Sequence, residues 1–141
     1  MLIGIATEEG LIRSIDESVG NYIPEFKDSE LSEITIRHLL LMASGLDWTE
    51  SGKNPLSNNA ESYYGTDLYG LVTRQRKIAK PGKTFIYQSG NSQLLGFIIE
   101  KASGKALSEY CSEKLWSQMN MESDAYWSLD KENGAEKAYC C

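Results

Sequence analysis

The run from Ser89 to Ser103 constrains the fold more than any other part of the sequence. Its apolar residues recur at the helical period and share one face: Leu94, Leu95, Ile98, Ile99 and Ala102. Gly104 follows directly, at a position where helices commonly end. The pattern predicts a long helix with one buried face, which requires other elements to pack against it.

Further helices are expected on both sides of this one. Met1 to Ala6 is apolar, ends near Gly10 and has no capping residue before it, so it indicates the later part of a buried helix. A short helix is expected between the capping pair Ser14 and Glu17 and the breaker Pro24. Two more helices are expected at 36–44, capped by Thr35 and closed by Gly45, and at 67–77, capped by Thr66. The last predicted helix is 107–118, whose apolar stripe consists of Leu107, Tyr110, Cys111 and Leu115.

The rest of the chain favours loops and a little strand. Residues 47–65 are rich in Ser, Asn and Gly and predict a long loop. Residues 84–87 predict a short strand, and the turn at Glu132-Asn133-Gly134 predicts a short hairpin. The expected fold is therefore mainly α with a few short β-strands, in a single domain.

Charge and composition exclude several classes of function. Fourteen Lys and Arg against twenty Asp and Glu give a net charge of −6, which disfavours a nucleic-acid partner. The apolar start is too short for a membrane span or a signal-peptide core. Three cysteines, Cys111, Cys140 and Cys141, make no disulfide framework, and a single histidine supplies no zinc site. No metal or organic cofactor is expected.

Three candidate sites, one for phosphate binding and two for catalysis, are rejected on chemical grounds. Gly82-Lys83-Thr84 lacks the glycine five positions earlier that a phosphate-binding loop needs. Ser128-Leu129-Asp130-Lys131 has the form of a serine nucleophile with a lysine base, but it runs into a solvated turn where the lysine stays charged. His38 lies in the first turn of an apolar helix, where a core or helix-end role is favoured over a general base.

The segment from Pro81 to Ser92 is different. Tyr87 leaves a short predicted strand, and small polar residues then open the long helix. This arrangement holds a phenol beside a helix N-terminus, whose positive potential lowers the cost of a phenolate. A purely structural tyrosine remains the alternative.

Three runs in this order resemble the class C type of serine β-lactamase-like hydrolases, which include penicillin-binding-protein-like peptidases. They are Ile34 to Trp48, Pro81-Gly82 through Tyr87, and Leu94-Leu95-Gly96 with Ile98 to Lys105. Met42 to Trp48 and the Tyr87-Gln88-Ser89 triplet are most similar to the 6-aminohexanoate-dimer hydrolase branch. The resemblance implies the helical subdomain of the β-lactamase/transpeptidase-like α+β fold.

The same resemblance implies site residues. Tyr87 matches the catalytic tyrosine, which relays a proton among serine, lysine and leaving group. Ser89 stands where the family more often has a substrate-binding asparagine. Trp48, Tyr63 and Tyr64 are expected in the loop bordering the substrate cleft, and we assign Ser89, Trp48 and Tyr64 to substrate binding.

Two family elements do not occur at their family positions in these 141 residues: the Ser-x-x-Lys nucleophile motif, which in the family opens a helix whose later part resembles Met1 to Glu9, and the Lys-Thr-Gly or His-x-Gly strand. The sequence therefore predicts a partial domain, 1–141, of a longer serine hydrolase that cleaves a small-molecule amide or ester through an acyl-enzyme. The chain alone is expected to be inactive and to form a homo-oligomer. A non-catalytic helical binding module derived from such an enzyme is the alternative.

Overall fold

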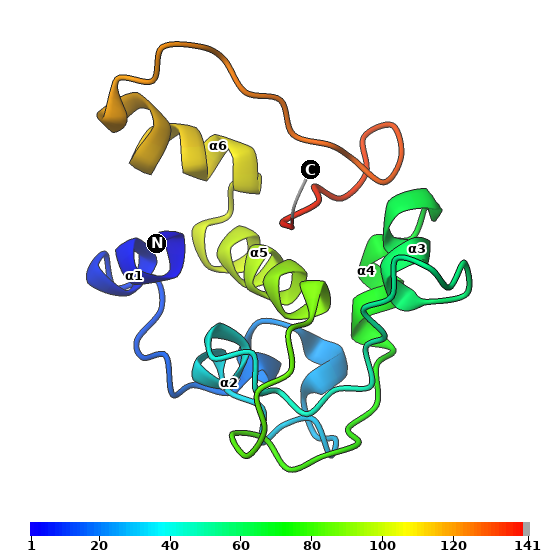
Figure 1. Cartoon of the computed structure of the whole chain (residues 1–141). Coiled ribbons are helices and arrows are strands. Elements are labelled where there is room, and N and C mark those ends of the chain that lie inside the picture. The colour runs from blue at the N-terminus through cyan, green and yellow to red at the C-terminus, as the bar shows by residue number, and fades with distance from the viewer. Residues whose placement is uncertain (140–141) are drawn as a thin grey trace.

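The computed structural model describes residues 1–139, and nearly all of their regular structure is helical (Figure 1). The α-helices are α1 Leu2–Glu8, α2 Ile36–Leu40, α3 Asn58–Tyr64, α4 Leu68–Thr73, α5 Ser89–Ser103 and α6 Leu107–Cys111. The remaining turns are the 3-10 segments η1 Val19–Asn21, η2 Pro24–Phe26 and η4 Ser117–Met119, and the π-helical segment η3 Ser112–Trp116.

Helix α5 lies at the centre, with α1, α2, α4 and α6 packed around it (Figure 1). The predicted apolar face is confirmed: Leu94, Ile98 and Ile99 are buried, and Leu95 and Ala102 pack partly buried against the same core. Gly104 ends the helix in the left-handed conformation, at φ 69°, which a glycine adopts without steric cost. The long helix is therefore the scaffold for the rest of the chain.

The N-terminal segment folds onto this scaffold as predicted. Ile3 and Ala6 of α1 are buried, and Gly10 follows the helix at φ 74°. The Leu11 amide donates to the Ala6 carbonyl at 2.9 Å and the Gly10 amide to the Thr7 carbonyl at 3.1 Å. These two bonds form the Schellman ending that glycine favours at a helix C-terminus.

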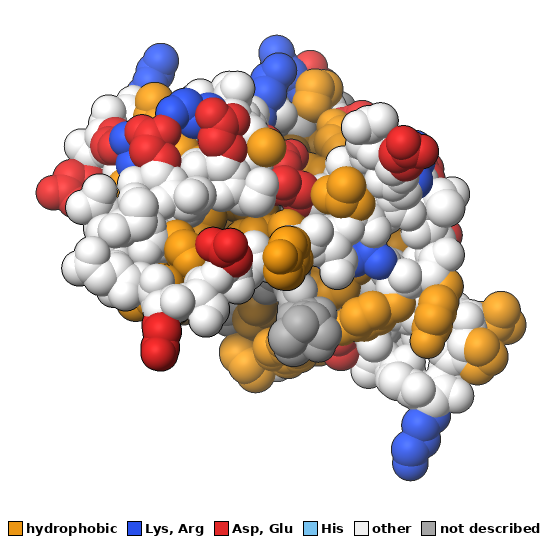
Figure 2. All heavy atoms as spheres, turned by 90° about the horizontal axis from the view of Figure 1, so that it is seen from above, with side chains coloured by type: hydrophobic (Ala, Val, Ile, Leu, Met, Phe, Trp, Pro, Cys, Tyr) orange, Lys and Arg blue, Asp and Glu red, His pale blue; other side chains and the backbone are white. Residues whose placement is uncertain are grey.

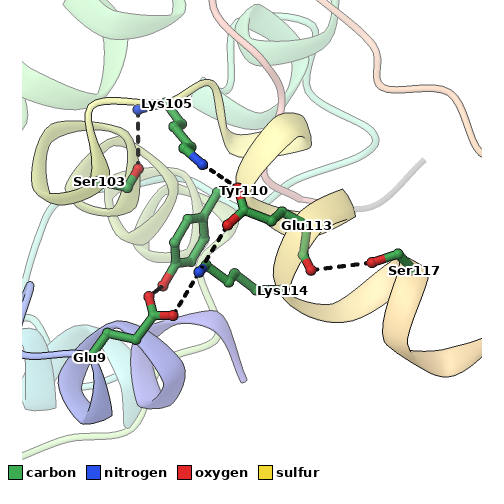
Figure 3. Close-up of polar contacts among 7 residues, drawn as sticks. All are labelled: Glu9, Ser103, Lys105, Tyr110, Glu113, Lys114 and Ser117. Carbon is green, nitrogen blue, oxygen red and sulfur yellow. Dashed lines mark hydrogen bonds and ion pairs between the residues drawn. The ribbon is translucent and has the colours of Figure 1, made fainter.

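A polar cluster joins the end of α1 to α6 and η3 (Figure 3). The Tyr110 hydroxyl donates to Glu9 Oε2 at 2.9 Å, and Lys114 Nζ lies 2.8 Å from Glu9 Oε1. Lys114 also pairs with Glu113, which pairs with Lys105. Burial, and then the bond to Glu9, raise the pKa of Tyr110 to about 12.

Helix α2 is shorter than the predicted 36–44. Thr35 caps it as expected, but the helix ends at Leu40 and Met42 takes φ 51°. The carbonyls of Met42 and Ala43 instead accept hydrogen bonds from the amides of Ile86 and Gly82, each at 2.8 Å. The predicted strand 84–87 is therefore wrong, because this segment is tied to the end of α2 and belongs to no strand ladder.

Other boundaries also differ. Helix α4 covers Leu68–Thr73 rather than 67–77, and Asp67, not Thr66, caps it. It stops early because Asp47 and Arg76 exchange hydrogen bonds: Asp47 N donates to the Arg76 carbonyl at 3.0 Å, and Arg76 N to Asp47 Oδ1 at 2.9 Å.

Two further segments have a different secondary structure from the predicted one: the helix after Ser14 and the loop 47–65. The expected helix after Ser14 is replaced by η1, capped by Ser18, and by η2, which Pro24 begins rather than ends. The predicted loop 47–65 contains α3, whose N-terminus Ser57 caps. The predicted helix 107–118 is a continuous helical run whose pitch changes along α6, η3 and η4.

Pairing of extended backbone is limited, among residues 1–139, to isolated antiparallel bridges. The predicted hairpin is reduced to one such bridge, Leu129 to Glu136, around a turn with Asn133 at φ 55°. Cys111 is a half-buried free thiol, and Cys140 and Cys141 lie outside the described residues. No helix within residues 1–139 is both long and apolar enough to cross a membrane.

Candidate active site

Tyr87 lies at the point where the extended segment 83–88 enters α5. Its side chain is 56% exposed and lines a groove of about 770 Å³, which we call the Tyr87 groove. Ser92 of α5 and Tyr63 of α3 line the same groove. The remaining lining residues come from the C-terminal segment: Ala125, Tyr126, Trp127, Ser128, Lys137, Ala138 and Tyr139.

Buried contacts hold the C-terminal wall of the groove in place. Gln93, fully buried on α5, donates to the Glu136 carbonyl at 2.8 Å and accepts from the Ala138 amide at 2.7 Å. The ring of Tyr139 meets that of Tyr63 edge to face at 5.6 Å, and its hydroxyl donates to the Ser62 carbonyl at 2.7 Å. Burial raises the pKa of Tyr139 above its usual value. The wall is thus fixed to both α3 and α5.

The residue after Tyr87 anchors the turn from behind. Gln88 is buried, and its Nε2 donates to the carbonyls of Leu46 at 2.9 Å and Trp48 at 3.1 Å. Ser44 donates to Asn91 Oδ1 at 2.7 Å, which joins the same loop to the first turn of α5. The backbone at Tyr87 is therefore held while its ring remains accessible.

Glu50 caps α5 from a distant part of the chain. Its Oε2 accepts from the Ser89 amide and from the Trp48 indole Nε1, both at 2.7 Å, and its Oε1 accepts from the Ser89 hydroxyl at 2.6 Å. A carboxylate at a helix N-terminus offsets the positive end of the dipole. The positive potential at the start of α5 is reduced accordingly.

Of the four residues assigned from the sequence, the structure brings Trp48 and Ser89 together, because both bond to Glu50. Trp48 is 5% exposed and its ring covers Gly90, where an added Cβ would lie 2.5 Å from Trp48 Cε3. Ser89 is 6% exposed and its hydroxyl is bonded to Glu50. Tyr64 is 89% exposed and is not among the residues that line the groove. Of the four, only Tyr87 lines it, together with Tyr63, the other tyrosine expected at the cleft.

Several residues around Tyr87 were not anticipated from the sequence. Glu50, Trp127, Lys137 and Tyr139 all contact the groove or the turn that presents Tyr87. The sequence did contain one indication of the role of Glu50. The helix that begins at Ser89 has no capping side chain directly before it, so an acidic residue in the loop 47–65 was a candidate to cap it. Trp127 and Tyr139 follow Tyr87 by 40 and 52 positions, and no local pattern links them to it.

The motifs rejected from the sequence have structural roles. Ser128 lines the groove, but Lys131 lies in the turn before Gly134, so the two do not share a helical turn. His38 Nδ1 accepts from the Thr35 amide at 3.1 Å, which completes a capping box for α2. No group of three or more His, Cys, Asp or Glu within residues 1–139 is placed to hold a metal ion.

Comparison with known proteins shows the family and the fold to which the chain is similar. Residues 1–139 match the family model described as Beta-lactamase. The 6-aminohexanoate-dimer hydrolase of Paenarthrobacter ureafaciens is 26% identical over 141 residues, which is 92% of this chain and 36% of that protein. The chain thus spans little more than a third of this relative's length.

Solved structures show the same similarity. A Bacillus anthracis protein provisionally assigned as a 6-aminohexanoate-dimer hydrolase aligns with 97% of this chain and 39% of its own, at 27% identity and a TM-score of 0.82. An octameric penicillin-binding protein homologue from Pyrococcus abyssi aligns with 86% of this chain and 29% of its own, at 27% identity and a TM-score of 0.63. The chain therefore belongs to the beta-lactamase family of hydrolases, and its helices have the fold of that family's helical subdomain.

Proposed function

We propose that residues 1–141 form a single partial domain of a serine hydrolase and supply the tyrosine side of its active site. In the whole enzyme, a serine and a lysine from a Ser-x-x-Lys motif would complete the site. The serine would attack an amide or ester carbonyl to form an acyl-enzyme. Membership of the hydrolase family supports the reaction class, and the share of each relative that is covered supports the partial domain.

The observation that carries the proposal is the position of Tyr87. Its phenol is exposed at one wall of a groove large enough for a small molecule, while Gln88 and Glu50 immobilise the turn behind it. A rigid, accessible phenol suits a group that passes a proton between nucleophile, base and leaving group. Tyr87 is thus the proposed catalytic residue.

The substrate-binding assignment changes with the geometry. Tyr63, Trp127 and Tyr139 line the groove, so we propose them as substrate contacts in place of Trp48 and Tyr64. Ser89 has its hydroxyl committed to Glu50, and its proposed part is to fix the start of α5 beside the site.

We also infer that the chain associates with copies of itself. Leu41, Phe85 and Ile86 are exposed, and the bond between Ile86 N and the Met42 carbonyl places their segments side by side. Exposed apolar surface of this kind favours self-pairing. The octameric homologue from Pyrococcus abyssi supports assembly in this family.

The reading frame upstream of Met1 tests the proposal directly. A Ser-x-x-Lys motif encoded in frame shortly before Met1, at the start of the helix that continues into α1, is the expected result. An upstream frame without this motif would favour the alternative, a helical binding module that has lost catalysis.

A further inference from the structure

A second hollow lies between the helical run α6–η3 and the segment that follows η4. After η4 the chain turns back at Asn120, which takes φ 50°, and passes over the helical run (Figure 1). The residues that form the two sides of the hollow are Cys111, Leu115 and Trp116 from the helices, and Asp124, Tyr126 and Trp127 from the returning segment. Its volume of about 440 Å³ is within the range typical of small-molecule sites. We call this space the Trp116 hollow.

Three aromatic rings line the Trp116 hollow. Trp116 is half-buried, Trp127 is 37% exposed, and Tyr126 lies at the open rim. Trp127 Nε1 donates to the Lys137 carbonyl at 2.9 Å, which fixes the indole and uses its one hydrogen-bond donor. What Trp127 offers to a ligand is therefore its ring. The face of an aromatic ring carries negative potential and attracts cations.

The charge in the lining has the sign that a cation requires. Asp124 is exposed and is the one charged side chain among the nine described residues that line the hollow. Lys114, on the same helical run, pairs instead with Glu9 and Glu113 toward α1 (Figure 3). The net charge of −6 adds a long-range attraction for cations.

The helical side of the hollow has little capacity to hydrogen-bond a ligand. Burial raises the pKa of the Cys111 thiol above its usual value, so the sulfur stays neutral and adds apolar surface beside Leu115. Ser108, also in the lining, has both its amide and its hydroxyl bonded to Glu136. Such a surface suits a cation without N–H donors.

We infer that the Trp116 hollow binds a small quaternary ammonium cation, with its methyl groups against Trp116 and Trp127 and its charge toward Asp124. Aromatic faces recognise such a cation because it combines an apolar surface with a positive charge. The inference goes beyond the proposed function and does not depend on it, since neither Trp116 nor Asp124 lines the Tyr87 groove.

The test compares choline with its uncharged carbon isostere, 3,3-dimethylbutan-1-ol, which has the same shape. Binding to the 141-residue chain is followed by the indole N–H resonances, of which the Trp127 signal is identified by its loss in Trp127→Phe. Choline should bind roughly tenfold more tightly than the isostere. The Trp127 signal should shift on binding, whereas that of Trp48, which is buried under α5 and lies outside the hollow, should not.

Two substitutions separate the ring from the carboxylate. Trp116→Leu keeps an apolar side chain and should lose most of the preference for choline, whereas Trp116→Phe keeps a ring and should retain part of it. Asp124→Asn should reduce the preference. Glu122→Gln, an exposed carboxylate outside the lining, is the matched control and should bind like the parent chain.

Equal binding of the two ligands, or no binding of either, would overturn the inference. A preference that persists unchanged in folded Trp116→Leu or in Asp124→Asn would do the same, as would an equal effect of Asp124→Asn and Glu122→Gln. The Trp48 signal reports whether each variant is folded. If Trp116→Leu does not fold, Asp124→Asn decides the matter, because a substitution at an exposed position is not expected to disturb the fold.

Discussion

The carboxylate of Glu50 accepts a hydrogen bond from the Ser89 hydroxyl at 2.6 Å, across 39 positions of sequence. The same carboxylate accepts from the Ser89 amide and from the buried indole of Trp48. One side chain thus satisfies the first turn of α5 and fixes the loop beneath it. Tyr87, two residues before Ser89, owes its defined position in part to this contact.

Glu50→Ala should therefore destabilise the fold. It removes an N-terminal cap from α5 and leaves the Trp48 N–H without its acceptor, so we expect a loss of about 1 kcal/mol in the free energy of unfolding. Urea unfolding followed by circular dichroism measures the change. Glu122→Ala, at an exposed position, is the control and should change stability by less than about 0.5 kcal/mol. Equal stability of the two variants would contradict the capping role.

A second prediction concerns alkaline pH. Burial and the bond to Glu9 raise the pKa of Tyr110 to about 12, against an ordinary value near 10. Because the folded state favours the protonated phenol, this stabilisation is complete below pH 10 and is lost as pH rises toward 12. The free energy of unfolding should therefore fall over this window.

Tyr110→Phe isolates that effect, since it keeps the ring and removes the ionisable hydroxyl. Its stability should be lower than that of the parent at neutral pH and should decline less steeply between pH 10 and 12. Tyr22 and Tyr69 have similarly raised pKa values, so part of the decline will remain. Identical pH profiles for the parent and Tyr110→Phe would rule out the contribution of Tyr110.

A third prediction concerns association. Light scattering at micromolar concentration should give the mass of a dimer or larger species, because Leu41, Phe85 and Ile86 leave apolar side chains exposed. Hydrophobic side chains are also exposed in several places on the face shown in Figure 2, among scattered charged groups. Phe85→Lys should shift the distribution toward monomer, while Leu56→Lys, exposed on a different loop, should not. A monodisperse monomer of the parent chain would refute self-association.

A fourth prediction is that the 141-residue chain alone does not hydrolyse a chromogenic cephalosporin or a p-nitrophenyl ester above background. Loss of a nucleophile and base that act as a unit typically costs on the order of a million-fold in turnover. Ser128 lines the Tyr87 groove, so Ser128→Ala is the necessary control. Turnover that disappears in this variant would make Ser128 a nucleophile and would disprove the prediction.

The sequence predicted local features better than long-range ones. The face of α5, the Thr35 cap and the ending of α1 at Gly10 follow from periodicity and capping, and the structure confirms them. The early end of α2 could not be predicted, because the Met42 carbonyl bonds to Ile86, 44 positions away. Local propensity favours a longer helix there, and a tertiary contact overrides it.

The residues of the candidate site were likewise predictable only where a local pattern marks them. Tyr87 could be found because a family motif surrounds it and because the change from extended chain to helix is visible in the sequence. Tyr63 and Tyr64 are adjacent, and only the rotation of α3 decides that Tyr63 lines the groove while Tyr64 is exposed to solvent. Lys137 carries no sequence signal, since its place in the groove depends on the bond from its Nζ to the Tyr63 carbonyl, 74 positions away.

Tyr87→Phe in the longer enzyme that carries the Ser-x-x-Lys motif tests the central claim most directly. The substitution keeps the ring and removes the hydroxyl, so turnover should fall roughly 10²- to 10⁴-fold while the unfolding midpoint stays close to that of the parent. Tyr126→Phe is the matched control, because Tyr126 lines the same groove and is 96% exposed, and it should keep near-parent turnover. Near-normal turnover of Tyr87→Phe would show that Tyr87 is structural and would contradict this account of the site.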